Sequence, residues 1–453
     1  MLKLLRLPQP LRQAAGGIVL AAVSLHAQGA NLLEVYRQAL SNDPTFDVAR
    51  HGLEVAQEKV PQALAGLLPT VSMTGSENYT GANASFNESP SQGLGYGTWA
   101  WTLQLTQPLF RLQNNYAYRE SQAQVESAEA DFAQAEQDLI LRVAQAYFDA
   151  LVAQEDIASA KAQLDAMEEQ SAEAKRGFEL GTMSITDSYE ARSKAEQARA
   201  QLISAQNALE VKQAELEKLT NVPPTILAGL KPAVVMPLPQ PSDPKVWIDQ
   251  AKDDNPTVRS QISALKAAGF SVYKAESENI WTLDFVASYG QNYSGGNVLV
   301  PSGYESRVKT NVVGVQFSVP IFAGGLNSSD IRVATANRDK LAAQLEETRR
   351  KAGTDARQAY SGIVSDQAQI EALRAAVESG ENSVKGNQAG YRLGIRINSD
   401  VLDAQQQLYG SKRDLIKARY DTLMQGLKLK AAAGVLTGAD VEVINGMLVY
   451  GVL

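Results

Sequence analysis

The 453-residue sequence contains no cysteine, which excludes disulfide frameworks, thiolate nucleophiles and cysteine metal ligands. It therefore also lacks a cysteine that could carry a lipid anchor after signal cleavage. Aromatic residues make up only 7% of the chain, and alanine, leucine and polar residues dominate. This composition is more typical of long solvated helices than of one large spherical core.

Histidine is scarce as well, and beyond residue 29 the sequence has only His51. The sequence has no phosphate-binding glycine loop and no pair of histidines at metal-ligand spacing. We therefore predict that the protein is not an enzyme and that it uses no metal or cofactor.

Beyond the N-terminus the sequence has no apolar run of 18 residues, so no membrane-spanning helix is expected. The N-terminus itself has the order of an export signal, with three basic residues and no acid before Glu34, an apolar run at 14–25 and small residues at 27–30. This order predicts a signal peptide over residues 1–29, because the run is too short for a membrane anchor. Removing its three basic residues changes the formal charge from −8 to −11, which argues against nucleic acid as a partner.

What the sequence does contain is a long internal repeat. The matching segments lie 212 or 213 positions apart: Pro44 and Pro256, 108–110 and 320–322, 177–181 and 390–394. Such a constant offset indicates that one architectural unit was duplicated whole. The predicted order is a first repeat at 30–222, a proline-rich linker at 223–244, a second repeat at 245–436 and a C-terminal segment at 437–453.

Each half contains two stretches in which apolar and polar residues alternate with period two. These stretches are 70–79 and 99–106 in the first half, and 283–289 and 313–319 in the second. Their length suits tilted membrane strands of ~9–11 residues, and their alternation suits a water-filled membrane barrel. A soluble hairpin with one buried face gives the same pattern. Polar, glycine-rich segments at 81–98 and 290–310 are expected to form the connecting loops.

The rest of each half predicts helices. Neither proline nor glycine interrupts 112–176, where apolar residues recur every three or four positions with a single stutter, as in a coiled coil. The counterpart is 326–389. Short turns at 177–184 and 390–398 should lead into returning helices at 185–219 and 399–433.

Four strands are too few for a membrane barrel, since the smallest such barrels have about eight. Unpaired strand edges are not tolerated in lipid. If the strands cross a membrane, several chains must therefore contribute to one barrel. The long helices would continue that barrel as a tube.

The duplicated order of elements resembles that of the TolC family of outer-membrane efflux proteins. The segments that carry the resemblance are 391–396, 400–404, 418–420 and 431–434. The resemblance implies a mixed α+β fold: a homotrimer whose outer-membrane β-barrel has four strands per chain, twelve in total, and continues as a periplasmic α-helical coiled-coil barrel. It also implies contact with outer-membrane lipid, a periplasmic adaptor and an inner-membrane transporter in a Gram-negative bacterium.

The resemblance further implies a gate at the periplasmic tip. Thr186 and Asp187 in the first half, and Tyr391 and Arg396 in the second, stand at the family's gate positions. Arg396 is expected to donate to Asp187 and Thr186, and Tyr391 to Asp187. The alternative is that these are ordinary turn and cap residues, with Asp187 at the start of a helix.

Asp400 and Asp403 correspond to the family's ring of aspartates at the narrowest point. Their i, i+3 spacing places them on one helix face. Three chains would bring six carboxylates together and favour cations. The alternative is a solvated helix face.

Two cargo classes stay open. The missing lipid-anchor cysteine and the segment 31–66 favour the channels that export proteases by type I secretion, with an ABC transporter. The alternatives are the outer-membrane duct of a multidrug efflux pump, coupled to a proton-driven transporter, and a soluble periplasmic coiled-coil protein.

Overall fold

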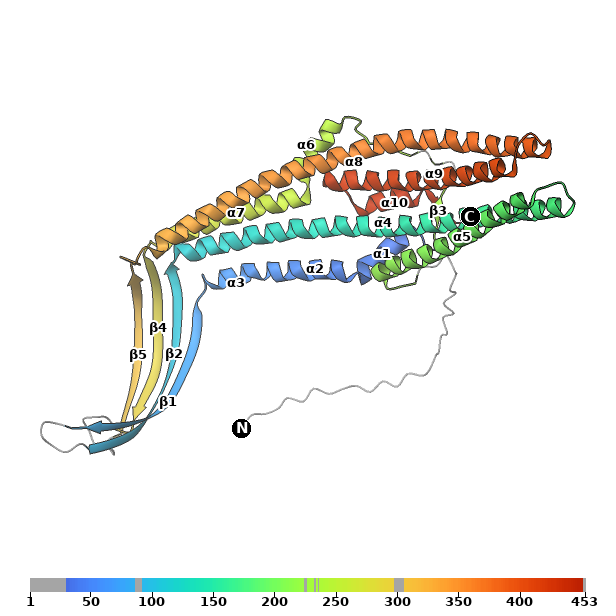
Figure 1. The fold of residues 1–453 in the computed structure, drawn as a ribbon. Coiled ribbons are helices and arrows are strands. Elements are labelled where there is room, and N and C mark those ends of the chain that lie inside the picture. Colours follow the sequence, from blue (N-terminus) through green and yellow to red (C-terminus); the bar gives the residue numbers. More distant parts are fainter. Residues whose placement is uncertain are drawn as a thin grey trace, which may run out of the picture.

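The computed structural model describes residues 30–85, 92–223, 226–231, 234, 236–296 and 305–450. The predicted signal peptide at 1–29 lies outside these residues. The chain is elongated, with a four-stranded sheet at one end and long helices running away from it (Figure 1). In the described part of the chain, no helix combines the length and the apolarity needed to cross a membrane.

The first repeat forms three short helices, a β-hairpin and a long helical hairpin. Its elements are α1 (Leu32–Asn42), α2 (Pro44–Gln57), α3 (Lys59–Ala65), β1 (Thr70–Ala84), β2 (Gln92–Phe110), α4 (Leu112–Glu179) and α5 (Ile185–Thr220). The second repeat has two helices instead of three before its β-hairpin and otherwise the same order: α6 (Pro244–Asp254), α7 (Pro256–Ser277), β4 (Thr282–Ser294), β5 (Ser306–Ser318), α8 (Leu326–Arg392) and α9 (Asn398–Ala432). The short β3 (Gly229–Leu230), α10 (Gly438–Asn445) and β6 (Leu448–Val449) lie outside this pattern and were not predicted.

A proline begins the matching helices α2 and α7 of the two repeats. Pro44 and Pro256 are first residues of their helices, and the preceding Asp43 and Asn255 accept hydrogen bonds from the backbone two residues later. Proline suits this position because its missing N–H would have no helical partner there. The repeated motif at Pro44 therefore encodes the same sharp start of a helix twice.

The long helices α4 and α8 span 68 and 67 residues. At 1.5 Å per residue each is roughly 100 Å long. All the predicted seam positions of α4 are at least partly buried, which confirms the coiled-coil pattern; they are Val125, Ala128, Phe132, Ala135, Leu139, Val143, Ala146, Ala150, Ala153, Ile157, Ala160, Leu164 and Met167.

The four long strands form one antiparallel sheet in the order β1-β2-β4-β5. The two hairpins have the same register: Thr70 faces Thr106 in the first and Thr282 faces Ser318 in the second, each residue advanced by 212 positions. The joint between the repeats is therefore the β2–β4 pair.

The predicted strands are confirmed. The loops expected at 81–98 and 290–310 are wrong in their bounds, because both ends of each range belong to the strands. The ladder continues through 81–84 and 92–98 in the first hairpin, and through 290–294 and 306–310 in the second. Ladder pairing uses backbone groups, so glycine and polar residues can extend a hairpin where no apolar face is required. At the other end, Val319 lies just beyond β5.

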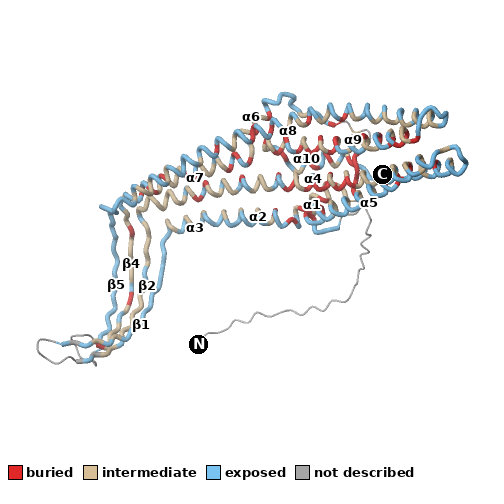
Figure 2. The backbone as a smooth tube through the Cα atoms, in the orientation of Figure 1, coloured by how far each residue is buried: buried red, intermediate tan, exposed pale blue. Residues whose placement is uncertain are grey.

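The main hydrophobic core lies in the middle of the helical part, where α1, α10 and β3 gather around α4 and α9 (Figure 2). Tyr147 is fully buried there, and its hydroxyl donates to the carbonyls of Ala228 (2.9 Å) and Ala30 (3.2 Å). Burial raises the pKa of this phenol. Leu227 and Leu230 are buried as well, so this part of the proline-rich segment packs into the core, whereas Leu238 and residues 240–244 are exposed.

Candidate functional site

The two helical hairpins, α4–α5 and α8–α9, end at the side of the molecule opposite the sheet (Figure 1). Both turns have the same construction. Gly181 and Gly394 adopt φ of +74° and +73°, a left-handed conformation that favours glycine. The next residues, Thr182 and Ile395, donate to carbonyls of the preceding helices at 2.8 and 2.9 Å. The repeated glycine motif is thus explained as a helix end of the Schellman type.

The earlier glycine of each motif leaves room for a side chain to fold over the helix end. A Cβ atom at Gly390 would lie 2.8 Å from Cγ of Arg396, and one at Gly177 would collide with Met183. Arg396 and Met183 therefore occupy equivalent places at the two tips. The repeats share a backbone here but differ in the side chain that covers it.

Thr186 and Asp187 begin helix α5. The Ser184 hydroxyl accepts from the Thr186 N–H at 3.0 Å, and the Asp187 carboxylate accepts from the Ser184 N–H at 3.1 Å. This reciprocal pair is a capping box. Within one chain, Asp187 therefore has the capping role that was the alternative to the gate.

Tyr391 reaches from the second hairpin to the first. Its hydroxyl donates to Sδ of Met183 at 3.1 Å, and no hydrogen bond joins it to Asp187. Partial burial raises the pKa of Tyr391, and the negative charges of Glu173 and Asp187 add to this effect. The structure thus brings Tyr391 near Asp187 without the predicted contact between them.

Arg396 does not reach Asp187 within the chain. Its guanidinium lies 3.5 Å from the carboxylate of Asp400, and its side chain is 58% exposed. An exposed pair of this kind contributes ~1 kcal/mol or less. Arg396 is therefore free to exchange Asp400 for another carboxylate at little cost.

Asp403 has a cationic neighbour from the other hairpin, which sequence reasoning missed. Lys194 on α5 lies 3.1 Å from the Asp403 carboxylate and donates to Gln406 at 3.2 Å. Both predicted ring aspartates are therefore paired within the chain. The charge that they present to a constriction is smaller than two isolated carboxylates would give.

A buried amide pair was also missed. Nε2 of Gln170 on α4 donates to Oδ1 of Asn398 at 2.7 Å, and the two residues are 6% and 2% exposed. The Asn398 amide nitrogen and the carbonyl oxygen of nearby Gln405 have no hydrogen-bond partner among the described residues. Because Asn398 is the first residue of α9, this pair fixes the start of the helix that carries both aspartates.

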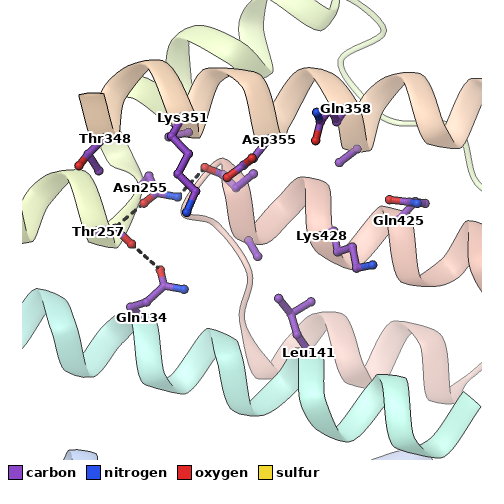
Figure 3. A pocket seen from close by; sticks show the side chains of 14 residues that line it. Gln134, Leu141, Asn255, Thr257, Thr348, Lys351, Asp355, Gln358, Gln425 and Lys428 are labelled. Carbon is purple, nitrogen blue, oxygen red and sulfur yellow. Dashed lines mark hydrogen bonds between the residues drawn. The ribbon is translucent and has the colours of Figure 1, made fainter. Parts of the chain in front are cut away.

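Other polar features lie away from the tips. A groove of about 540 Å³ runs between α4, α7, α8 and α9 and presents Lys351, Asp355 and Lys428 (Figure 3). Asn255 at its edge donates to the carbonyl of Ala432 at 2.9 Å. Among the described residues, no group of three histidine, cysteine or acidic side chains is placed to hold a metal ion. The hydrogen bonds along this groove therefore connect α7 to the neighbouring helices α9 and α4.

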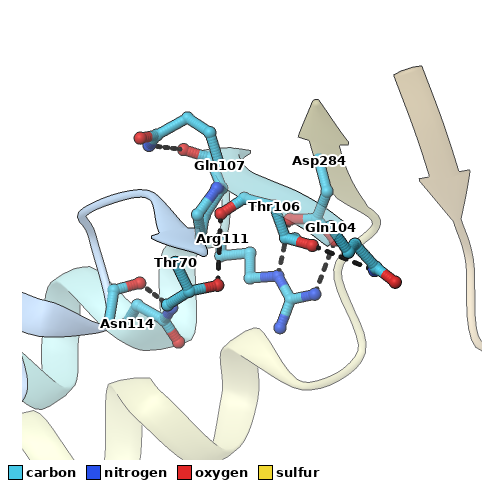
Figure 4. Close-up of polar contacts among 9 residues, drawn as sticks. Thr70, Gln104, Thr106, Gln107, Arg111, Asn114 and Asp284 are labelled. Carbon is cyan, nitrogen blue, oxygen red and sulfur yellow. Dashed lines mark hydrogen bonds and ion pairs between the residues drawn. The ribbon is translucent and has the colours of Figure 1, made fainter. Parts of the chain in front are cut away.

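A second polar cluster joins the sheet to the helices (Figure 4). Arg111, which precedes α4, makes two hydrogen bonds to Asp284 of β4, at 2.8 and 2.5 Å. Asn114 donates to the Gly66 carbonyl at 2.5 Å and Gln107 to that of Leu67 at 3.0 Å. Gln107 and Asn114 thus connect β2 and α4 to the segment between α3 and β1, and Arg111 connects the start of α4 to β4.

This fold, with its paired hairpins, defines an outer-membrane channel. The sequence profile described as outer membrane efflux protein matches residues 35–222 and again 247–435. The chain belongs to this family, which consists of channels rather than enzymes. The two matches confirm the internal duplication, and the family places the protein in the outer membrane with its helices in the periplasm.

Individual relatives agree with this assignment. The alkaline protease secretion protein AprF of Pseudomonas aeruginosa is 32% identical over 429 residues, which cover 93% of this chain and 88% of AprF. The outer membrane protein TolC of Escherichia coli is 29% identical and covers 95% of this chain and 88% of TolC. The crystal structure of the Campylobacter jejuni CmeC outer membrane channel superimposes with a TM-score of 0.76 at 19% identity, over 98% of this chain and 97% of CmeC. The mixed α+β channel fold is confirmed.

Proposed function

We propose that the protein is the outer-membrane exit duct of a type I secretion system and exports a protein such as a protease. The partners are an inner-membrane ABC transporter, which supplies the energy, and a periplasmic adaptor. The similarity to AprF over nearly the whole chain carries this assignment of cargo, because AprF is named for protease secretion. The long helices supply a reach of roughly 100 Å towards the inner membrane.

The duct is a homotrimer in this proposal. One chain supplies four strands, and β1 and β5 each have one neighbour in the sheet. Edge strands exposed to lipid would leave backbone groups without hydrogen bonds. Three chains give a closed barrel of twelve strands, in the size range of known membrane barrels.

The gate consists of Thr186, Asp187, Tyr391 and Arg396, with Arg396 acting between chains. Its exposed guanidinium and weak contact with Asp400 support this role. Charge-assisted hydrogen bonds to Asp187 and Thr186 of a neighbouring chain would stabilise the closed state by ~1.5–3 kcal/mol each. An adaptor that binds the open state better than the closed one can offset energies of this size.

Asp400 and Asp403 form the constriction ring in the same proposal. They lie on the exposed or half-exposed side of α9, one turn from the gate. Arg396 and Lys194 set how much of their charge faces the passage. If the gate opens by moving Arg396 away from Asp400, the electrostatic field in the constriction therefore changes.

Deletion of the gene in its native host tests the cargo assignment. We expect secreted protease to disappear from the medium and to return when the intact chain is supplied in trans, while drug susceptibility stays unchanged. The second candidate function is multidrug efflux, which the similarity to TolC also supports. Normal protease export with increased drug susceptibility would replace the first proposal by the second.

A further inference from the structure

The long strands carry few charges, and both of their cations lie near the end of the sheet that is remote from the helices. The charged residues of the four strands are Glu77, Asp284, Arg307 and Lys309. Asp284 is paired with Arg111 beside the helices. Arg307 and Lys309 stand at the start of β5, among the hairpin tips (Figure 1). Because the helices lie in the periplasm, this end of the sheet lies at the outer surface of the membrane.

Both cations are on the face of the sheet that bears its apolar side chains. Side chains alternate between faces along a strand, so Arg307 and Lys309 share a face with Val313. The ladder aligns Val313 with three further apolar residues on the same face, and the whole row is Val71, Leu105, Ala287 and Val313. The apolar face of a membrane barrel is the one that contacts lipid. The two cations are therefore on the lipid-facing side.

Aromatic side chains lie beside these cations. The ladder aligns Trp99, Tyr293 and Arg307 in one row across β2, β4 and β5. The two rings stack with their centroids 5.6 Å apart, and the guanidinium carbon of Arg307 lies 6.0 Å from the centroid of Tyr293. The next row on this face contains Trp101 and Lys309. Because tryptophan and tyrosine concentrate at the level of lipid headgroups, these two rows mark that level.

A second aromatic group lies at the periplasmic end of the sheet. Trp281 stacks on Phe110 with centroids 4.3 Å apart and lies 5.6 Å from the ring of Phe317. Phe317 follows Arg307 by ten residues on β5. This separation is about 33 Å along the strand. With a strand tilt of ~40° it corresponds to about 25 Å along the membrane normal, the height of the apolar band in membrane barrels. Arg307 therefore lies at the headgroup level of the outer leaflet.

Lys309 lacks the kind of partner that exposed lysines have on the helices. Lys266 of α7, for example, donates to both carboxylate oxygens of Glu126, each at 2.8 Å. In the part of the chain that the structure describes, no carboxylate lies within ion-pair distance of Lys309. Its charge is therefore available to an anion from outside the chain.

Two acids share this face but leave the excess of positive charge on β5 in place. Glu77 lies in the row of Arg307 on β1, three strands away, which is about 14 Å. Glu305 precedes β5 and lies beside the hydroxyl of Tyr293. The lipid-facing side of β5 itself thus presents two cations and no acid.

We propose that Arg307 and Lys309 bind a phosphate group of lipid A in the outer leaflet. Their Cα atoms are about 7 Å apart on one face of the strand, so both side chains can reach a phosphate between them. A guanidinium forms two parallel hydrogen bonds to phosphate oxygens, and an ammonium group adds a point charge. Acyl chains of the same lipid would lie against Val313 and Val315, which are 71% and 59% exposed.

The lipid site goes beyond the export duct, because it depends on the position of the sheet in the outer membrane and not on the cargo. It also differs from a site for free phosphate. The apolar band next to the cations adds contacts that only a lipid can use. Lipid A should therefore bind more tightly than inorganic phosphate.

Binding of lipid A to the purified protein tests the site. The intact protein in a neutral detergent is titrated with diphosphoryl lipid A, and native mass spectrometry measures the bound lipid. We expect Arg307→Gln with Lys309→Gln to weaken binding roughly tenfold or more, because both phosphate contacts are lost. The exchange variant, Arg307→Lys with Lys309→Arg, keeps both charges and should stay within about threefold of the wild type. Lys309→Gln alone should also weaken binding, and it breaks no ion pair of the described chain.

A pair of residues on α8 provides the matched control. Arg338 and Lys340 have the same spacing as Arg307 and Lys309, and both are exposed, but they lie outside the sheet. Arg338→Gln with Lys340→Gln removes the same charge and should leave the binding of lipid A unchanged. Size-exclusion chromatography verifies that each variant has the same oligomeric state as the wild type.

Two further ligands identify the source of the phosphate. Dephosphorylated lipid A should bind the wild type as weakly as diphosphoryl lipid A binds the glutamine double variant. Inorganic phosphate at the same concentration should not displace diphosphoryl lipid A. Displacement would replace the lipid site by a site for free phosphate.

The proposal is overturned if the wild type, the glutamine double variant and Lys309→Gln bind diphosphoryl lipid A equally well. Equal binding of the phosphorylated and dephosphorylated lipids would overturn it as well, since the cations would then have no role. An equal loss in the α8 control would assign the effect to net charge instead of to this site. None of these results decides protease export, which the gene deletion tests separately.

Discussion

Arg111 and Asp284 lie 173 positions apart in the sequence and form a bidentate ion pair where the sheet meets the helices (Figure 4). Arg111 comes from the first repeat and Asp284 from the second, so the pair joins the two halves of the chain. The equivalent positions of the other halves are Ala323 and Ser72, which cannot form such a pair. The internal joint thus has an electrostatic contact that a joint between chains lacks.

Removing one member of this pair should destabilise the protein. Asp284 is 6% exposed, so Arg111→Ala leaves its carboxylate buried without a counter-charge. We expect a loss of about 1–3 kcal/mol, below the range for a fully buried pair because the Arg111 side chain is 37% exposed. Thermal unfolding followed by circular dichroism measures it. Lys266→Ala breaks an exposed pair and should cost less than about 1 kcal/mol; equal effects of the two variants would contradict the role of burial.

Weakening the proposed gate should open the channel. We expect Asp187→Ala and Arg396→Ser each to increase single-channel conductance in a planar bilayer, because both remove a charge-assisted contact of the closed state. Asp187 also caps α5, so Ser184→Ala is the matched control: it disturbs the same capping box but keeps the carboxylate. An increase in the control as large as that in Asp187→Ala would assign the effect to the helix cap.

The constriction ring should determine ion selectivity. The double variant with Asp400→Asn and Asp403→Asn is expected to reduce cation selectivity, measured as the reversal potential in a salt gradient. Lys194→Gln removes the cation beside Asp403 and should shift the reversal potential in the opposite direction. Identical reversal potentials in all three proteins would rule out a role for these residues.

The buried amide pair should stabilise the position of α9. Gln170→Ala leaves the Asn398 side chain buried with no partner for its carbonyl oxygen, which should cost ~1–3 kcal/mol in thermal unfolding. Replacing both residues, as Gln170→Leu with Asn398→Leu, removes both polar groups and should recover most of the loss. A double variant as unstable as the single one would indicate that packing volume, not the hydrogen bond, matters here.

Acidic pH should affect the stability of the α8–α9 hairpin through Asp366. Burial and the nearby Asp421 raise the pKa of Asp366 on α8, although Lys417 opposes them. An acid with a raised pKa binds its proton more tightly in the folded state, so its contribution is stabilising below the ordinary pKa of 3.8 and is lost as the pH rises through the folded value. Asp366→Asn should therefore increase stability at pH 7 and reduce the dependence of the unfolding temperature on pH below neutrality. The exposed Asp339→Asn is the control and should change neither.

Much of the architecture follows from the sequence because its signals are local. Pro44 and Pro256 locate helix starts by their missing N–H groups, and Gly181 and Gly394 locate helix ends by their left-handed backbone. Period-two alternation located the strands, but not their ends. The ladder continues through residues such as Gly93 and Gly95, whose pairing depends on the partner strand and not on their own side chains.

The candidate site was accessible from the sequence only in part. The motifs around Asp187 and Tyr391 placed these residues at two tips, and the fold does bring those tips together. Lys194 beside Asp403, and Gln170 against Asn398, carry no such signal. They meet because α4, α5 and α9 pack side by side, which joins positions more than 200 residues apart.

The sequence by itself determined the repeat, the order of helices and strands, and the need for more than one chain if the strands enter a membrane. These depend on periodicity, on backbone-restricting residues and on the number of strands. Only the tertiary structure decided which side chains pair: Arg111 with Asp284, Asp187 with its own helix cap, and Arg396 with Asp400. Arg111 and Asp284 meet across an interface whose register is set by the packing of whole elements, so no local pattern encodes their pairing. The other two pairs are local, at i, i+3 and i, i+4, but the sequence alone leaves open whether Asp187 and Arg396 pair within their own helix starts or across the tip.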